Sequence, residues 1–523
     1  MERTISQSNT TTQGEHVTRE RLWWRVVRAL FPFLVQPEAD RAPPTYDRAG
    51  DHLFLPESRS AKDFLYPETL TLGVTLLSVV VGLVALLTLT LGLSPLVSLT
   101  GLVALFYASF LLFKFVIVLK ALQFPLIDFS RQEIAALSEA ELPTYTILVP
   151  LLKEAEVAEQ IIAALSSIDY PADKIDLLIT LEEHDTETRD ALLAAGLPDH
   201  WRIVTLPDTT PKAKPKSLNV AFKEARGEYL VIYDAEIIPD SDQLKKAVLA
   251  FRHHPDIAVM QTRLDHYNTH QSLLTRLFTT EFTFHYDLFL PGLQAYHLPI
   301  PLSGHSVHYR TEALREVGAW DSYNVAEDCE LGMRLYRHRY TTGMMNSLSR
   351  EEAAGDLMGW IKQRTRWMKG FIQTSVVHLR YPLALKDELG SWRMFLGFLV
   401  LVPGTVLINL LNFGSWFILI AWFATGAGVI QEMYPAPVLY LSGFFAIVGG
   451  FAFLYLNLIA LYYRGKFDLV RFWPLTPLYW ILLSFATARA VWQMRSAASA
   501  HTWEKTTHGT HRTIEPIPDP LTT

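Results

Sequence analysis

The chain has 523 residues, of which 50% are hydrophobic and 19% are charged, and its formal net charge is −7. The mean hydropathy is positive, which indicates a membrane protein that also carries a soluble part. The acidic balance, together with the lack of a basic stripe interleaved with aromatic residues, argues against a nucleic-acid-binding protein. The single cysteine, Cys329, excludes an intramolecular disulfide and a zinc site built from cysteines.

An N-terminal segment over residues 1–68 contains a candidate amphipathic helix from Arg19 to Leu34. Arginines would occupy one face and apolar side chains the other, as in a helix that lies in a membrane surface; a partner-binding helix is the alternative. Residues 69–120 predict a transmembrane hairpin, because two long apolar runs are joined by a linker without charge. This charge-free tip predicts that both ends of the hairpin lie in the cytoplasm.

Residues 140–380 predict a soluble α/β domain. Short β-rich runs, TYTILVPL, IDLLITL, WRIVTL and YLVIYD, alternate with amphipathic helical stretches. This alternation predicts a mainly parallel, Rossmann-like sheet with ligands bound beyond the carboxyl ends of the strands. A second apolar region over residues 390–492 precedes a tail over residues 493–523, so the domain would be inserted between helical transmembrane segments.

Two acids spaced one residue apart, Asp234 and Glu236, end the run VIYDAEIIPD. In a strand or its immediate extension, their side chains would point to the same side. Two carboxylates aimed at one point suit a hard cation, Mg²⁺ or Mn²⁺, with phosphate oxygens completing its shell. The alternative is a turn with solvated acids, so the other motifs decide between the two.

Further polar residues fall near the same predicted edge of the sheet. Glu182 and Asp185 follow the second strand and could accept hydrogen bonds from a nucleobase and ribose; a solvated acidic loop is the alternative. In PKAKPKSLN, Lys214 and Lys216 precede Asn219 at a helix start, which suits a diphosphate, with a plain basic loop as the alternative. Jointly these residue types describe a site for a nucleotide diphosphate.

Two motifs lie farther along the domain. PLSGHSVHYR places Gly304 where the backbone must come close to another group, next to His305. In NVAEDCELGMRL, Glu327 and Asp328 start an amphipathic helix, so plain N-terminal capping is the alternative to a functional role.

The motif QRTRW lies on a predicted helix. Gln363, Arg366 and Trp367 are spaced at i, i+3 and i+4, so they would project from one face. An aromatic plane beside an arginine and an amide suits a sugar; an interfacial tryptophan near a membrane is the alternative.

In this order, the acids after the second strand, KPKSLN, DAE, AED and QRTRW resemble the motif set of the membrane-embedded family 2 glycosyltransferases. This inverting group includes cellulose, mannan and hyaluronan synthases. The resemblance covers about residues 145–378 and extends to bacterial exopolysaccharide synthases of the cellulose-synthase-like type, whose C-terminus often reads like WEKTTHG. It implies a GT-A-like fold for the α/β domain.

The resemblance also implies a role for each matched residue. Asp328 would be the general base, and the metal ion, Mg²⁺ or Mn²⁺, would be held by Asp234 and Glu236. The nucleotide sugar would contact Glu182, Asp185, Lys216, Asn219, Asp234, Arg364 and Arg366. The acceptor would contact Trp367, Gln363, Glu327 and His305. The chain departs from the family pattern at Glu236, where the family has Asp, and at Ala326, where it has Thr.

The implied activity is the inverting, metal-dependent polymerisation of a nucleotide-diphosphate sugar into a β-linked exopolysaccharide, with secretion across the membrane. UDP-glucose is the expected donor and GDP-mannose the alternative. The partners would be this donor, a growing glycan acceptor and the lipid bilayer, with accessory export proteins left open. The protein would be a multi-pass protein of the plasma (inner) membrane with a cytoplasmic catalytic domain. Transfer of one sugar to a lipid acceptor, or a non-catalytic receptor or scaffold, are the rival interpretations.

The number of membrane crossings depends on residues 393–427. A helix of that length would be about 50 Å long, too long for one perpendicular crossing. The region of Asn409 and Asn412 is therefore expected to be a hairpin tip or the end of an interfacial helix. With further spans over residues 438–462 and 474–491, we predict six crossings and a cytoplasmic C-terminus.

Overall fold

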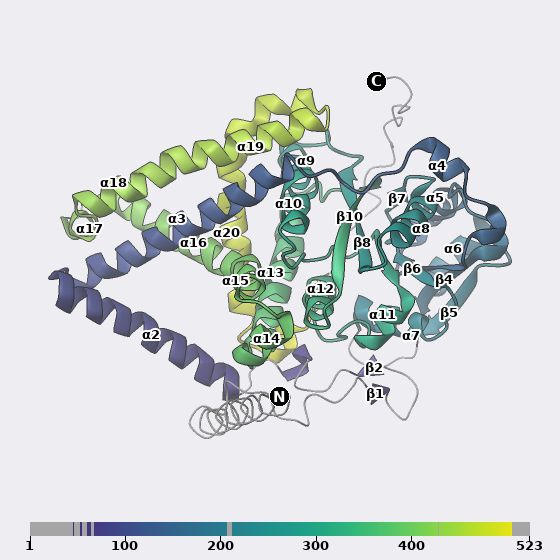
Figure 1. The fold of residues 1–523 in the computed structure, drawn as a ribbon, viewed down its shortest axis with the longest axis horizontal. Helices are drawn as coiled ribbons and strands as arrows, with labels where there is room; N and C mark the ends of the chain where they lie inside the picture. Colours follow the sequence, from purple (N-terminus) through teal and green to yellow (C-terminus); the bar gives the residue numbers. More distant parts are fainter. Residues whose placement is uncertain are drawn as a thin grey trace, which may run out of the picture.

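The structure is a computed structural model of the chain, and it describes residues 45–46, 53–54, 60–63, 67–206, 212–426 and 428–504. The candidate helix Arg19–Leu34 and most of WEKTTHG lie outside these residues. Figure 1 shows an α/β domain on one side and a fan of long helices on the other. The predicted α/β domain between long apolar helices is therefore confirmed.

The sheet of the α/β domain has eight strands in the order β5-β4-β3-β6-β9-β8-β10-β7. The pairs β3/β4, β3/β6, β4/β5 and β8/β10 are parallel, whereas β9 and β7 run antiparallel to their neighbours. The strands are β3 (Tyr145–Pro150), β4 (Ile175–Glu182), β5 (Arg202–Leu206), β6 (Tyr229–Ile232), β7 (Ile238–Pro239), β8 (Ile257–His266), β9 (Val307–Arg310) and β10 (Thr341–Glu351). A separate two-stranded sheet joins β1 (Thr45–Tyr46) and β2 (Leu53–Phe54).

Helices cover this sheet, which explains why its central strands are apolar throughout. Ile147 of β3 pairs with Leu177 of β4 and with Val231 of β6, and all three are fully buried. The α-helices of the domain are α4 (Arg131–Ala135), α5 (Ala158–Ser166), α6 (Thr186–Ala194), α7 (Lys214–Phe222), α8 (Gln243–His253), α11 (Thr311–Glu316) and α12 (Glu327–Arg337). The register brings the carboxyl ends of β3, β4 and β6 to one edge, where the candidate site lies.

A second set of helices joins the domain to the long apolar helices: α9 (Leu273–Phe284), the π-helix η8 (His285–Phe289), α10 (Leu290–Ala295), α13 (Leu357–Leu379) and α14 (Pro382–Leu389). Gly292 of α10 packs against Ile117 of α3 (Pro95–Ala121) so closely that an added Cβ would fall 2.7 Å from the Ile117 side chain. Short 3-10 turns complete the chain: η4 (Ala61–Asp63), η5 (Glu139–Glu141), η6 (Ala155–Val157) and η7 (Ala172–Lys174).

Among the described residues, five helical stretches are long and apolar enough to cross a membrane. They are Gly73–Leu91 within α2 (Pro67–Leu91), α3, α15 with α16 (Trp392–Leu401, Pro403–Thr425), α18 to α19 (Ala436–Phe444, Gly450–Tyr463, joined by the π-helix Phe445–Gly449) and η10 with α20 (Phe467–Leu475, Thr476–Gln493). A short helix, α17 (Gly428–Met433), precedes α18, and α21 (Ala497–Ala500) follows α20. The side of the membrane on which the domain lies stays a prediction.

The prediction of six crossings is wrong for the described residues, because no hairpin forms near Asn409 and Asn412. Both residues lie inside α16. Asn409 donates from its Nδ2 to the Thr405 carbonyl oxygen at 3.0 Å, so its polar group is satisfied within the helix. Pro403 stands in the first turn of α16, where no backbone N–H is needed, and α15 and α16 form one apolar helical stretch over Trp392–Thr425.

The last long helix, α20, lies along α13 of the domain. Trp360 of α13 donates from Nε1 to the Tyr479 hydroxyl at 3.1 Å, and one to two turns later Thr365 donates to the Ala486 carbonyl at 3.4 Å. After α20, the chain returns to the domain, where the Lys369 ammonium donates to the Ser499 carbonyl at 3.0 Å. The last described residues therefore lie beside the α/β domain.

A buried charge cluster fixes the end of α19 to the domain. Arg464 forms an ion pair with Asp287 of η8, and Arg263 of β8 donates to Asp287 at 2.8 Å. Lys466 pairs with Asp265 of β8 at 2.7 Å. Burial by itself would raise the pKa of Asp287, but the Arg464 and Arg263 guanidiniums hold it below its usual value. These pairs tie the helical fan to the central sheet.

We expect Arg464→Ala to destabilise the protein by about 3 to 5 kcal/mol, because it leaves the buried Asp287 and Asp265 carboxylates with one cation fewer. The measurement is thermal unfolding of the purified protein in detergent. Arg471→Ala is the matched control, since Arg471 lies on the exposed face of the following segment. Equal unfolding temperatures for the two variants would contradict this role of the cluster.

Candidate active site

The acidic pair lies in a turn directly after β6. The strand ends at Ile232, and the Ile237 N–H donates to the Asp234 carbonyl at 3.1 Å, which closes the turn. The expected strand extension is therefore wrong in its geometry. Asp234 and Glu236 nevertheless line the same cavity, which is about 1140 Å³ in volume.

A lysine from the start of α7 meets this pair. Lys214 Nζ lies 2.5 Å from one carboxylate oxygen of Asp234 and donates to the Gly304 carbonyl at 2.7 Å. Burial alone would lower the pKa of Lys214, but Asp234, Asp328 and Glu327 hold it above its usual value. Lys216, the lysine assigned to the diphosphate from the sequence, is only 1% exposed and does not line the cavity. The structure thus brings Lys214 to the site and leaves Lys216 beneath it.

Asp328 stands in the first turn of α12 and faces the same cavity. An added Cβ at Gly304 would lie 2.9 Å from its Oδ2 and 3.5 Å from Lys214 Nζ, so Gly304 leaves the room that both groups occupy. A helix N-terminus favours a carboxylate. Burial, followed by the neighbouring Glu327 and Asp234 carboxylates, outweighs this effect and raises the pKa of Asp328 well above its usual value.

The acidic turn fits a divalent metal ion. Asp234 and Glu236 supply hard oxygen ligands of the kind that Mg²⁺ and Mn²⁺ prefer. No cluster of three or more His, Cys, Asp or Glu side chains with metal-binding geometry occurs in the described part of the chain. An ion held here would therefore take its remaining ligands from the phosphate oxygens of a nucleotide.

Of the residues assigned to the nucleotide, Glu182 reaches the cavity, and its Oε2 is buried without a hydrogen-bond partner. Asp185 instead caps α6, where its side chain accepts from the Thr188 N–H at 3.3 Å and from the Lys153 N–H at 2.6 Å. Asn219 holds the Trp320 backbone by donating to its carbonyl at 2.8 Å and accepting from its N–H at 3.1 Å. Neither Asp185 nor Asn219 lines the cavity, so their predicted contacts with a nucleotide stay predictions.

The motif QRTRW lies in α13 and faces the cavity through Gln363, Arg364, Arg366 and Trp367. The Arg366 guanidinium stacks over the ring of Trp503, 4.1 Å from its centroid. Burial lowers the pKa of Arg366, and the acids Glu327 and Asp234 oppose this effect. The sequence did not assign Trp503 to the site, although it belongs to the quoted WEKTTHG run.

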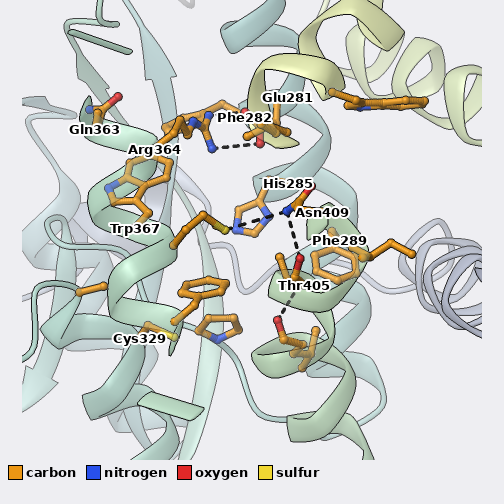
Figure 2. A pocket seen from close by; sticks show the side chains of 18 of the residues that line it. Glu281, Phe282, His285, Phe289, Cys329, Gln363, Arg364, Trp367, Thr405 and Asn409 are labelled. Atoms are coloured by element: carbon orange, nitrogen blue, oxygen red, sulfur yellow. Dashed lines mark hydrogen bonds and ion pairs between the residues drawn. The ribbon is translucent and has the colours of Figure 1, made fainter. Parts of the chain in front are cut away.

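Arg364 points toward the long helices rather than toward the acidic turn. It forms an ion pair with Glu281 of α9, which Figure 2 shows beside Trp367, and donates to the Tyr479 hydroxyl at 2.8 Å. Its guanidinium also lies 4.3 Å from the centroid of the Trp367 ring. The ion pair with Glu281 holds the Arg364 guanidinium in place over the Trp367 ring, so Arg364 orients the plane of that ring. Its predicted contact with the nucleotide stays a prediction.

His305 enters the site as half of a carboxylate–imidazole pair. Its Nε2 lies 2.8 Å from Oε2 of Glu351, and its buried Nδ1 has no partner. Burial would lower the pKa of His305, but Glu351 raises it above its usual value. Glu351 ends β10 and also lines the cavity. Nothing in the local sequence around Glu351 pointed to it, because the pairing joins the segment just before β9 to the end of β10.

The sheet edge with its acidic turn, facing lysine and buried carboxylate at a helix start defines a glycosyltransferase domain of the GT-A-like class. Residues 229–488 match the profile described as glycosyl transferase family group 2. Both the resemblance and the enzyme class inferred from the sequence are thereby confirmed.

Curated relatives agree with this family. The chain is 24% identical over 233 residues to "Probable glycosyltransferase YdaM" of Bacillus subtilis (strain 168). This match covers 44% of this chain and 56% of the relative. It is 23% identical over 249 residues to "Probable glucomannan 4-beta-mannosyltransferase 1" of Arabidopsis thaliana, covering 46% of this chain and 45% of the relative. The matched part of this chain thus spans about half the length of these relatives.

Among solved structures, the fold is similar to mannosyltransferase PcManGT from Pyrobaculum calidifontis, a structure in complex with GDP-Man and Mn²⁺. The TM-score is 0.41 and the sequence identity 17%, and the match covers 71% of this chain and 98% of the other.

We expect Gly304→Ala to weaken the binding of a nucleoside diphosphate with Mn²⁺ by roughly tenfold or more, because the added methyl displaces the Asp328 and Lys214 side chains. Isothermal titration with the purified protein measures this change. Gly414→Ala in α16 is the control, since a Cβ there meets nothing within 4 Å. Unchanged affinity in the Gly304 variant would show that the nucleotide does not use this corner of the cavity.

Proposed function

We propose that the protein is an inverting, metal-dependent glycosyltransferase that polymerises sugar units from a nucleotide-diphosphate sugar into a β-linked exopolysaccharide and passes the product across the membrane. The observation that carries this proposal is the extent of one cavity. The cavity includes Asp234 and Asp328 in the α/β domain and also Thr100 near the far end of α3. A transfer site and a path between the long helices are therefore continuous.

The chemistry follows from the groups that face the cavity. An acceptor hydroxyl is a poor nucleophile, and Asp328 would accept its proton as the oxygen attacks the anomeric carbon of the donor. Attack opposite the leaving group turns an α-linked donor into a β-linkage. Lys214 and Arg366 would stabilise the negative charge that gathers on the departing diphosphate. A divalent ion at Asp234 and Glu236 would add to this charge stabilisation.

We assign acceptor binding to four residues that line the cavity together with the acidic turn. Trp367 offers a ring plane for a pyranose face, and Gln363 and His305 offer polar groups for hydroxyls. Glu327 lines the cavity with both carboxylate oxygens buried and without partners, so it is available to accept from sugar hydroxyls. This set matches the acceptor residues inferred from the sequence and remains a proposal.

The membrane part of the cavity suits a hydrophilic chain. Along α3, the distance from Lys114 to Thr100 is about 21 Å, most of a bilayer core. Polar side chains at that depth are costly unless they are hydrogen-bonded. The described cavity wall carries several of them: Asn409, Asn412 and Ser415 from α16, Ser442 from α18 and Asn457 from α19. Each asparagine here makes at least one hydrogen bond within the protein and keeps further donor or acceptor capacity that a polar occupant could use. A glycan fits this lining better than the acyl chain of a lipid acceptor, which favours a polymer product over a glycolipid.

UDP-glucose is the proposed donor and GDP-mannose the second candidate. The plant relative is named as a 4-β-mannosyltransferase, which gives GDP-mannose its support. The proposed setting is a plasma (inner) membrane with the α/β domain in the cytoplasm, because the substrate is a cytoplasmic nucleotide sugar.

We expect the purified protein, offered several nucleotide sugars with Mg²⁺ or Mn²⁺, to release nucleotide and form a polymer from one of them. Asp328→Asn is expected to lower turnover by about 10²- to 10⁴-fold while nucleotide binding is retained, because the base is lost and the shape is kept. Radiolabelled product analysis separates polymer from glycolipid. A glycolipid, or full activity in the Asp328 variant, would overturn the proposed product or the proposed base.

The kcat/KM of the transfer reaction is expected to depend on pH. Asp328 must be ionised to accept a proton, and its pKa lies well above the usual value. The wild-type kcat/KM should therefore fall with decreasing pH at values well above about pH 4, where an ordinary aspartate titrates. The residual activity of Asp328→Asn should not show this acidic limb.

Ala446→Trp is expected to shorten the polymer severalfold while the initial rate of nucleotide release stays within about twofold. Ala446 lines the membrane part of the cavity, so a large side chain there would obstruct the product and not the transfer site. Gel filtration of the product and a nucleotide-release assay measure the two effects. Leu439→Trp is the control, because Leu439 is exposed on the same helical run. Equal product lengths for both variants would argue against this path.

A further inference from the structure

One charged side chain lies in the membrane part of the cavity wall. Among the described cavity-lining residues of the five apolar stretches, Lys114 of α3 is the only one with a charged side chain. It forms no hydrogen bond or ion pair within the described part of the chain, and its position is about 10 Å from the end of α3 that enters the domain. An ionisable residue at such a depth is costly and marks a binding or transport role.

Three phenyl rings surround the Lys114 ammonium. Its Nζ lies 4.9 Å from the ring centroid of Phe110, 5.4 Å from that of Phe453 and 5.5 Å from that of Phe289. The rings come from α3, α19 and η8, and all three line the cavity. We call Lys114 and these three phenylalanines the collar. Ring faces attract a cation but carry no net charge, so none of the three rings supplies a counter-ion to the ammonium.

The nearest charged groups do not supply a counter-ion. Glu281, which also lines the cavity, is already paired with Arg364 and accepts from the Tyr479 hydroxyl at 2.6 Å. His285 lies buried nearby, and burial, followed by the Lys114 charge, lowers its pKa to about 3, so it is neutral. The collar region therefore carries a net charge of one positive unit. A ligand with a negative charge would offset it.

We propose that the collar binds an acidic group on the growing glycan, so that the polymer made by this protein carries carboxylates or comparable anionic substituents. The acidic units would enter from a nucleotide-activated uronic acid used beside the neutral hexose donor proposed above. The inference rests on the proposed function and extends it to the class of acceptor. A neutral glycan would leave the Lys114 charge uncompensated in a low-dielectric wall. An acidic sugar would pair its anion with the ammonium and lay its apolar face on a phenyl ring. The polar lining beyond the collar favours a glycan over the phosphate of a lipid as the bearer of that anion.

The test compares two oligosaccharides that differ only in charge. Cellotetraose and its 6-carboxylate form are titrated into the full chain in nanodiscs, and nanodiscs with and without undecaprenyl phosphate form a separate arm. We expect the carboxylate form to bind at least about tenfold more tightly than cellotetraose, as for one added charge-assisted contact. Lys114→Met should reduce this preference below about threefold, and Lys114→Arg should retain it.

Lys120→Met is the control for a general loss of positive charge, because Lys120 is exposed at the end of the same helix. Equal binding of the two oligosaccharides by the wild type would overturn the inference. A Lys114-dependent response to undecaprenyl phosphate, with no preference between the oligosaccharides, would overturn it in favour of a lipid phosphate. Because binding needs no turnover, these results are separate from the donor screen, whose failure would instead reject the proposed polymerisation.

Discussion

The close approach of α13 to the start of α12 is the contact on which the site depends. A Cβ at Gly370 would overlap the Ala326 side chain, so the two backbones meet without an intervening side chain. Just after this contact, Gln373 accepts from the Val325 N–H at 3.0 Å. Ala326 directly precedes Glu327 and Asp328, and Arg366 and Trp367 lie one turn before Gly370. The distance between the base and the acceptor platform is therefore set by a backbone contact, which is stiffer than any pair of side chains.

The same helix, α13, also carries the helical fan. Trp360 and Arg364 bind the Tyr479 hydroxyl of α20, and Lys369 holds the carbonyls of Ser499 and Thr502, each at 3.0 Å. The same helix thus touches the base, the acceptor platform and the last described segment. Movement of the long helices would reach the transfer site through α13, because α20 is hydrogen-bonded directly to it.

Much of this arrangement could be predicted from the sequence, because strand and helix periods and short motifs are local signals. The strands β3 to β6 fall where the quoted runs placed them. The predictions that were wrong or incomplete concern features that depend on packing. Lys214 and Lys216 are two residues apart on a helix, so they point about 200° apart, and the sheet decides which of them is buried. The acidic turn at Asp234 and the pairing of Arg364 with Glu281 depend on contacts that the local sequence does not encode.

The distribution of charge along the cavity links its two ends. Glu182, Glu236 and Glu327 join Asp234 and Asp328 around the transfer site, whereas Lys214 and Arg366 are the basic groups nearest to them. A nucleotide diphosphate entering this acidic region would be repelled unless it arrives with a cation, and the acidic turn is where that cation fits. The collar at Lys114 is positively charged, opposite in sign to the acidic groups around the transfer site. An acidic glycan would therefore be repelled from the transfer site and attracted toward the membrane path, a direction imposed by fixed charges alone.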